Sequence, residues 1–227
     1  MNNLSGIQKK YIKYFIFKLL FLFFKKSKDQ MIMYCLLIFF KTGQEKIDYS
    51  EYTLLSPDYY TLDNENEFLE SINMDMYFYK DVWNKKGNTD DGEWLPKMVS
   101  NHLCMLESQK RGFSMVSSSI LKGDKFKFIM FIRPDISIQN DLPVDSILSN
   151  PNKIHIPRHG NWWWGVNDQF AIMNYEYANL YGNRINEAAD YRKNIGRLVS
   201  EAYCKFIISK YNMTMNMLDF RYCITRP

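Results

Sequence analysis

The stretch KFKFIMFIRPDISI, residues 125–138, constrains the fold more than any other part of this 227-residue chain. Its middle, residues 128–132, is apolar at every position, so a strand formed there would be covered on both faces. Such a strand is typical of the centre of a sheet with helices on both sides. Pro134 lacks the N–H group that a central ladder needs. The strand is therefore predicted to end at Arg133, with Asp135 just past its C-terminal end.

Strand and helix patterns alternate along the rest of the chain. Apolar residues recur every three or four positions from Trp94 to about Leu121, which predicts a helix with His102 packed on its apolar face. Other helices are expected over 63–70, from about Tyr175, and over 186–211. Strands are expected at 31–40, 52–55, 74–79, 152–157, 168–174 and, as one or two strands, 213–224. This alternation favours an α/β, Rossmann-like fold with a mostly parallel central sheet flanked by helices.

The N-terminal segment, residues 1–30, differs from the remainder in charge. It carries seven lysines against one aspartate, a charge of +6, so the net +4 of the whole chain leaves −2 for residues 31–227. We therefore expect a basic, hydrophobic segment at 1–30 followed by one domain at 31–227. Because that domain is close to neutral, nucleic acid is not an expected partner.

An apolar run from 11 to 24 lies between lysine pairs in this segment. It is shorter than the roughly 20 residues that a membrane-spanning helix needs. Three interpretations stay open: an uncleaved membrane anchor, an interfacial helix on an anionic membrane surface, or a helix packed on the domain. Alternatively, residues 11–40 form one hydrophobic hairpin.

Cysteine and histidine usage argues against a zinc site. The chain has three histidines, and its cysteines are scattered without Cys-x-x-Cys spacing at Cys35, Cys104, Cys204 and Cys223. Structural zinc sites usually bring such ligands in closely spaced pairs. We therefore expect buried free thiols.

Two short motifs carry the candidate chemistry. Arg133 and Asp135 follow the central strand, at the edge where open α/β sheets bind ligands. A carboxylate there suits Mg²⁺ or Mn²⁺, and an arginine offers a planar donor fork to phosphate. Asn167 and Asp168 open a later strand, where Asp168 is placed to act as a general base on a hydroxyl group. On spacing alone, ordinary turns would explain both motifs.

The second motif is preceded by three consecutive tryptophans, Trp162, Trp163 and Trp164. A helix or an ordinary strand would turn these rings to different faces and leave some in water. Indole rings have flat apolar faces on which the C–H faces of sugars can stack. Gly160 and Gly165 flank the rings and would let the loop open and close. The segment is interpreted as a flap over a sugar or acceptor, or alternatively as a loop folded onto the core.

In this order the features resemble GT-A-type glycosyltransferases, the small capsule- and glycan-building enzymes of bacteria, algae and large DNA viruses. The matching text is FIMFIRPDISI, with Arg-x-Asp after a strand, and GVNDQFAIMN, with Gly-x-Asn-Asp-x-Phe-Ala before a helix. LVSEAYCKFII, which contains Glu201, and LDFRYCITRP resemble the family's later helix with its acid and its closing strand. The likeness covers residues 94–227.

The resemblance implies transfer of a sugar from a nucleotide-sugar donor to a hydroxyl of a glycan or glycoprotein acceptor, with Mn²⁺ or Mg²⁺ as cofactor. Asp135 would meet the metal or the diphosphate beside Arg133, and Asp168 would be the base if the reaction inverts the anomeric centre. TGQEK is a loose match to the family's nucleotide motif and would supply Gly43 and Gln44. The residues expected to contact the acceptor or sugar are Trp162, Trp163, Trp164, Asn167 and His159.

The chain departs from the family's pattern at Arg133, which stands where many of those enzymes have the first acid of Asp-x-Asp. A single carboxylate, Asp135, is left for the metal. This departure favours a second hypothesis, a catalytically inactive relative that binds glycan or membrane as a structural protein. A metal nuclease, suggested by Pro134-Asp135, is disfavoured because no Asp-x-Lys or Glu-x-Lys follows and the domain is not basic.

Overall fold

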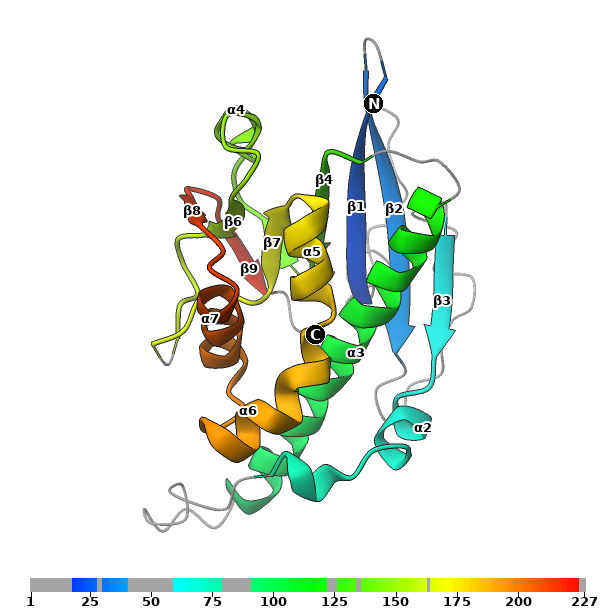
Figure 1. The fold of residues 1–227 in the computed structure, drawn as a ribbon, viewed down its shortest axis with the longest axis vertical. Helices are drawn as coiled ribbons and strands as arrows, with labels where there is room; N and C mark the ends of the chain where they lie inside the picture. The colour runs from blue at the N-terminus through cyan, green and yellow to red at the C-terminus, as the bar shows by residue number, and fades with distance from the viewer. Residues whose placement is uncertain are drawn as a thin grey trace, which may run out of the picture.

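The computed structural model describes residues 18–27, 30–40, 59–78, 91–121, 126–133, 136–162 and 164–224; for residues 18–27, 30–40, 59–63 and 91–96 it describes the backbone alone. Strands, α-helices and 3₁₀ helices (η) alternate along the chain (Figure 1). The first half contains β1 (Lys18–Ser27), β2 (Gln30–Phe40), β3 (Tyr59–Asp63), α2 (Glu65–Glu70), η2 (Met74–Met76), α3 (Asp91–Leu121) and β4 (Phe128–Ile132). The second half contains β5 (Ile136–Ile138), α4 (Val144–Leu148), β6 (Ile154–Pro157), β7 (Phe170–Met173), α5 (Tyr175–Gly182), η4 (Arg184–Glu187), α6 (Ala188–Asn194), α7 (Ser200–Lys210), β8 (Met215–Leu218) and β9 (Tyr222–Ile224).

Seven of the described strands form one sheet in the order β3-β2-β1-β4-β7-β6-β8, and β5 pairs with β9 in a second sheet. The pairs β2–β3 and β6–β8 are parallel, whereas the other four neighbouring pairs of the large sheet are antiparallel. The expected mixture of helices and a sheet is present, but the expectation of a mostly parallel sheet is wrong for the described strands. Parallel neighbours need long crossovers. Only two residues separate β1 from β2, and a loop without a helix joins β6 to β7, so these pairs run antiparallel.

The strand β4 lies between β1 and β7, and all five of its residues are buried, as its apolar run predicted. Alternate side chains enter two different cores. Ile129 and Phe131 face the larger core, to which α3, α5 and α7 contribute. The other three residues of β4 face a smaller core that includes Ile147 of α4, Phe220 and Tyr222.

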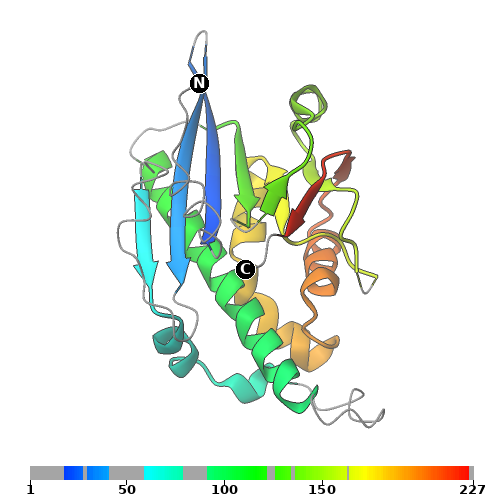
Figure 2. The same ribbon diagram turned by 180° about the vertical axis from the view of Figure 1, so that it is seen from behind.

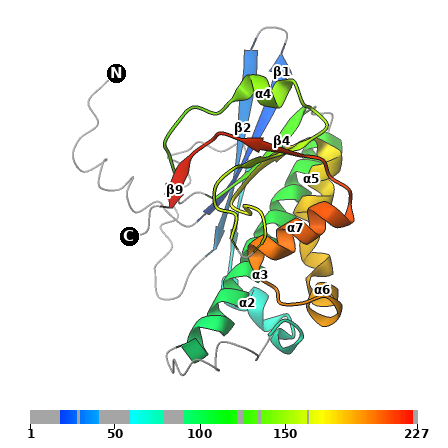
Figure 3. The ribbon, with the colours of Figure 1, turned by 90° about the vertical axis from the view of Figure 1, so that its left-hand side faces the viewer.

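The longer helices α3, α5, α6 and α7 all lie on one side of the large sheet (Figure 3). Seen from behind, β1, β2 and β3 lie in front of α3 (Figure 2). The expectation of helices on both faces is therefore met in part, because only a short helix covers the second face among the described residues. On the second face of β4 the short helix α4 and the chain from β8 to β9 provide the cover, because Leu218, Phe220 and Tyr222 turn inward there.

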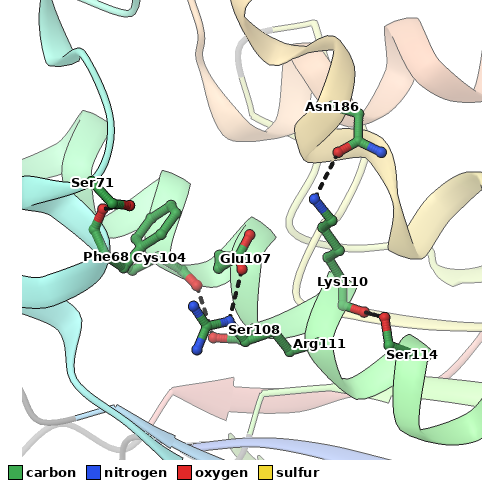
Figure 4. Close-up of polar contacts among 9 residues, drawn as sticks. All are labelled: Phe68, Ser71, Cys104, Glu107, Ser108, Lys110, Arg111, Ser114 and Asn186. Atoms are coloured by element: carbon green, nitrogen blue, oxygen red, sulfur yellow. Dashed lines mark hydrogen bonds and ion pairs between the residues drawn. The ribbon is translucent and has the colours of Figure 1, made fainter.

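Helix α3 confirms the helix predicted from Trp94 to about Leu121 and crosses the sheet face diagonally (Figure 1). Its buried side chains recur at helical spacing and include Val99, His102 at 7% exposure, Leu103, Leu106, Phe113 and Val116. The Ser108 hydroxyl on this buried face donates to the Cys104 carbonyl at 2.8 Å, so it is not left unsatisfied (Figure 4).

A polar contact ties the middle of α3 to η4. Lys110 Nζ donates to Asn186 Oδ1 at 3.0 Å, across 76 residues of sequence (Figure 4). One turn along, Arg111 Nε and Glu107 Oε1 form an i,i+4 ion pair at 2.7 Å. Since Asn186 lies in η4, the first of these contacts helps to hold Arg184 of the same short helix against α3.

The C-terminal helices follow the predicted pattern in part. Helix α5 begins at Tyr175, as expected, where the Asn174 side chain accepts a hydrogen bond from the Tyr177 N–H at 2.9 Å. The segment 186–211 was expected as one amphipathic stretch but forms η4, α6 and α7. Gly196 lies in the break between α6 and α7, where glycine's backbone entropy disfavours a continuous helix.

Near the N-terminus, β1 and β2 pair as an antiparallel hairpin, which matches the hairpin interpretation over residues 18–40. Residues 1–17 lie outside the described part. Among the described helices none has both the length and the apolar character needed to cross a bilayer.

Two further strand predictions have different outcomes. The strand expected at 74–79 is wrong, because residues 74–76 form η2, where the Asn73 side chain accepts from the Asp75 N–H at 3.1 Å and starts a turn. The strand expected at 52–55 lies outside the described residues.

Candidate functional site

The two predicted motifs meet at one edge of the large sheet. Strand β4 pairs with β7 antiparallel, with Ile132 opposite Phe170, and the Arg133 N–H donates to the Gln169 carbonyl at 3.0 Å. The end of β4 therefore lies beside the start of β7. This pairing brings Arg133 next to the Asn167-Asp168 motif, more than thirty residues later in the sequence. Pro134 and Asp135 lie outside the described residues, so the predicted donor and metal role of Asp135 stays a prediction.

The chain from 158 to 169, which we call the tryptophan loop, joins β6 to β7. Asn167 holds it together from inside and is 1% exposed. Its Oδ1 accepts from the N–H groups of Gln169 and Phe170 at 2.9 and 3.2 Å. Its Nδ2 donates to the His159 carbonyl at 2.9 Å and to the Tyr222 hydroxyl at 2.6 Å. Four hydrogen bonds use the full ordinary capacity of the amide, so Asn167 fixes the position of the neighbouring Asp168.

Two of the three tryptophans are described, and both rings face solvent. Trp162 is 66% exposed and Trp164 is 93% exposed. The Gly165 N–H donates to the Trp162 carbonyl at 2.8 Å, which closes a tight turn. Trp164 sits in this turn with a φ of 60°, a left-handed conformation that bulky residues rarely adopt. The described rings are therefore not folded onto the core; Trp163 lies outside the described residues.

Gly165 seats the tryptophan loop on α7. A Cβ at this position would lie 2.1 Å from the backbone carbonyl carbon of Glu201. The next residue, Val166, donates its N–H to the Glu201 carbonyl at 3.1 Å. One turn further along α7, Lys205 Nζ donates to the Trp164 carbonyl at 2.9 Å. The structure thus uses Gly165 for close backbone contact, while the opening and closing motion predicted for the loop stays a prediction.

Asp168 is the buried acid of the site, at 5% exposure. Burial, which disfavours the charged form, raises the pKa of its carboxyl group to about 6, and repulsion by the Glu201 carboxylate adds to this shift. The guanidinium groups of Arg184 and Arg133 act in the opposite direction. At neutral pH the group is therefore mostly ionised, but it is a stronger base than an ordinary aspartate.

His159 and Tyr222 line the other side of the tryptophan loop. Their ring centroids lie 4.6 Å apart, with the planes at 60° to each other. The Tyr222 hydroxyl also lies 3.2 Å from Gln169 Oε1, to which it donates. His159 is half-buried, and its Nε2 has no hydrogen-bond partner within the described part of the chain. Because this nitrogen is buried, the contact to acceptor or sugar predicted for His159 stays a prediction.

Sequence reasoning missed two residues of this cluster. Arg184 lies in GNRINE, a stretch with no motif, and Tyr222 lies in the closing strand; neither position carries a local signal. Glu201, noted as the acid of the later helix, is half-buried at the start of α7 and accepts from the Ser200 hydroxyl at 2.8 Å. Its influence on Asp168 depends on a contact between distant segments, so no sequence pattern could reveal it.

The nucleotide and metal predictions fall largely outside the described residues. Gly43 and Gln44 lie in the undescribed stretch 41–58. Among the described residues, no group of three or more His, Cys, Asp or Glu side chains is placed to hold a metal ion. Asp135, the predicted ligand of Mn²⁺ or Mg²⁺, lies outside the described residues, so the metal site stays a prediction.

Comparison with known proteins adds no constraint. No protein-family model, no curated protein and no solved structure matches this chain significantly. The resemblance to GT-A enzymes accordingly rests on the sequence motifs alone.

Proposed function

We propose that this protein is a GT-A-like glycosyltransferase, which moves a sugar from a nucleotide-sugar donor to a hydroxyl of a glycan or glycoprotein acceptor. The observation that carries the proposal is the state of Asp168. Its carboxyl group is buried, its pKa is raised to about 6, and it follows directly on a loop with two exposed indole rings. A tuned base beside an aromatic surface suits chemistry on a sugar hydroxyl.

The proposed role of Asp168 is general base. A base works best when its pKa lies near the operating pH, because it is then both ionised and able to hold a proton. Asp168 would accept the proton of the acceptor hydroxyl as the hydroxyl oxygen bonds to the anomeric carbon of the donor sugar. The bond from that carbon to the diphosphate breaks, and the nucleoside diphosphate leaves with the electron pair. Attack from the opposite face inverts the anomeric centre.

The tryptophan loop would supply the surface for the sugar. Trp162 and Trp164 present apolar ring faces to solvent in the same loop that carries Asp168. Stacking of a pyranose C–H face on such a ring is favourable because it removes apolar surface from water. His159 of the same loop is proposed as a polar contact to the sugar, which would require the loop to move because its Nε2 is buried.

The donor side would lie at the end of β4. Arg133 carries a cation with a planar donor fork that suits a diphosphate. Asp135 would be the oxygen ligand of Mn²⁺ or Mg²⁺, an ion that would neutralise charge on the leaving diphosphate.

An inactive glycan-binding protein is the alternative. The exposure of Trp162 and Trp164 favours it as much as it favours the enzyme, because a binding surface needs no base. The two hypotheses differ in what they require of Asp168: only the enzyme needs that carboxyl group as a base.

The test combines donor binding with donor hydrolysis, since the acceptor is unidentified and water can replace it. The full chain is titrated calorimetrically with a panel of UDP- and GDP-sugars in Mn²⁺, and release of free UDP or GDP is then measured. Asp168→Asn removes the proposed base, and Asp135→Ala removes the proposed metal ligand. Asp145→Asn, an exposed acid in α4, is the matched control.

We expect one donor to bind and to be hydrolysed, with a loss of about 10²-fold or more in Asp168→Asn and no change in Asp145→Asn. Weaker donor binding in Asp135→Ala would support the assigned donor side. No binding of any donor would refute the enzyme. Glycan binding that Trp164→Ala abolishes, without hydrolysis by the wild type, would establish the inactive alternative.

A further inference from the structure

Arg184 is a charged side chain in the interior of the protein. It is 1% exposed and is the largest of the fully buried side chains. A guanidinium group this deep is strongly destabilising unless an opposite charge compensates it. No ion pair to Arg184 occurs among the residues that the structure describes. We therefore expect a negative group that lies near Arg184 without contacting it and that offsets the cost of burying its positive charge.

Neighbouring aromatic residues hold Arg184 in place. Its Nη1 donates to the Tyr181 carbonyl at 2.9 Å, and the guanidinium carbon lies 3.8 Å from the centre of the Tyr181 ring. The Tyr203 hydroxyl donates to the Arg184 carbonyl. The two Tyr181 contacts use Nη1 and one face of the guanidinium group, and the Tyr203 bond holds the Arg184 backbone.

The other edge of the Arg184 guanidinium group makes no hydrogen bond within the described chain. Nε and Nη2 are buried and have no hydrogen-bond partner within the described chain. These two nitrogens point their N–H groups to the same side and form the fork with which arginine binds carboxylates. Within the described residues, no carboxylate contacts this side of the guanidinium group, so its positive charge is not neutralised by an ion pair.

A short chain of contacts leads from Arg184 to Asp168. Beyond the Tyr181 ring, the Cys204 thiol lies 3.8 Å from the Tyr181 hydroxyl and 3.9 Å from the Asn167 carbonyl. Asn167 directly precedes Asp168, the buried carboxylate of this cluster. Tyr181 and Cys204 thus connect Arg184 to the backbone of the residue that precedes Asp168.

The groups that face Asp168 come from several elements. Glu201 of α7 raises the pKa of Asp168, whereas Arg184 of η4 and Arg133 at the end of β4 lower it. Two others stay neutral, because burial raises the pKa of Cys204 to about 12 and that of Tyr181 well above its ordinary value. His102 of α3, which faces Arg184, is also neutral, since burial and Arg184 lower its pKa to about 3. Arg184 is therefore the interior cation, and Arg133 is the cation at the half-buried edge.

We propose that Arg184 is a positioning residue whose buried charge, fixed against the Tyr181 ring, keeps the Asp168 carboxylate ionised against the repulsion of Glu201. The inference rests on the proposed function only in so far as Asp168 is the catalytic base. In the glycosyltransferase, Arg184 would set the pH above which the base is ready. It would do so without touching donor or acceptor.

The test is a direct titration of Asp168 in the full chain without donor or acceptor. The carboxyl carbon is followed by NMR in protein labelled with ¹³C-aspartate and assigned with Asp168→Asn. Arg184→Met removes the charge, and Arg184→Lys keeps it while removing the fork. Arg158→Met removes an exposed arginine of the tryptophan loop as the matched control.

We expect the midpoint of Asp168 to rise by about one pH unit or more in Arg184→Met, and to change by less than about half a unit in Arg184→Lys and Arg158→Met. In Glu201→Gln the midpoint should fall. An unchanged midpoint in Arg184→Met would overturn the proposal, as would an equal shift in Arg184→Lys. Because no substrate is present, this result is independent of whether any donor is turned over.

A second measurement covers the case in which Arg184→Met does not fold. If the two charges compensate each other, removal of both should restore what removal of one destroys. The double variant Arg184→Met with Asp168→Asn is then expected to fold and to unfold at a higher urea concentration than Arg184→Met. A double variant no more stable than Arg184→Met alone would refute the coupling.

Discussion

Gly165 is the position at which a single methyl group should do the most damage to the candidate site. In Gly165→Ala the new Cβ would lie 2.1 Å from the Glu201 carbonyl carbon, 2.3 Å from its oxygen and 2.4 Å from the Ala202 nitrogen. All three are backbone atoms of the first turn of α7. Real Cβ contacts essentially never fall below 3.0 Å, so the loop and the helix must separate by about 0.9 Å.

The expected loss follows from two terms. Overpacking of a tight contact costs about 1–3 kcal/mol. The separation also weakens the hydrogen bond from the Val166 N–H to the Glu201 carbonyl, which contributes about 1 kcal/mol. Gly165→Ala should therefore lower the free energy of unfolding by about 2–4 kcal/mol. With an m-value of about 2 kcal/mol/M, the urea midpoint should drop by about 1–2 M.

Urea unfolding followed by far-UV circular dichroism measures this loss without relying on the tryptophans of the loop. Gly196→Ala is the matched control, because a Cβ at Gly196 meets nothing within 4 Å and its φ is not in the left-handed region. That variant should be unchanged or more stable by up to about 1 kcal/mol. The reasoning is refuted if Gly165→Ala unfolds within about 0.5 kcal/mol of the wild type, or if both glycine variants lose the same amount.

Three further predictions concern the same loop. The folded protein binds the Asp168 proton more tightly than the unfolded chain, whose carboxyl group has an ordinary pKa of 3.8, so the free energy of unfolding should fall by up to about 3 kcal/mol as pH rises from about 4 through about 6. In Asp168→Asn the urea midpoint should depend much less on pH across this range. Donor turnover by the wild type should rise over the same range. Asn167→Ala should lower the free energy of unfolding by about 2–4 kcal/mol, because buried partners lose four hydrogen bonds, while Asn152→Ala, at an exposed asparagine, should change it by less than about 0.5 kcal/mol; equal urea midpoints for the two would contradict the bonding scheme. Trp164→Gly should be more stable than Trp164→Ala by about 1 kcal/mol, because φ at this position is 60°, and thermal melts that rank alanine above glycine would count against the left-handed turn.

Local pattern accounts for the elements that were predicted correctly. The apolar run of β4 and the three-and-four spacing of α3 depend on residues close in sequence, and both elements occur where these patterns place them. The predictions of secondary structure were wrong where a local pattern is compatible with two different structures. Residues 74–79 have strand-like composition, but the Asn73 side chain starts a 3₁₀ turn instead. The stretch 186–211 has one apolar face, yet it is broken near Gly196.

The sequence by itself determined which segments are apolar enough to be buried. It also determined which residues, Asp168 and the tryptophans above all, are candidates for function. Tertiary structure alone decided that β4 and β7 run antiparallel, so that Arg133 lies beside Gln169. Tertiary structure also placed Glu201, which raises the pKa of Asp168, and Arg184, which lowers it, around the same buried carboxyl group. The physical reason is that periodicity is set by neighbours along the chain, whereas desolvation and charge coupling are set by neighbours in space.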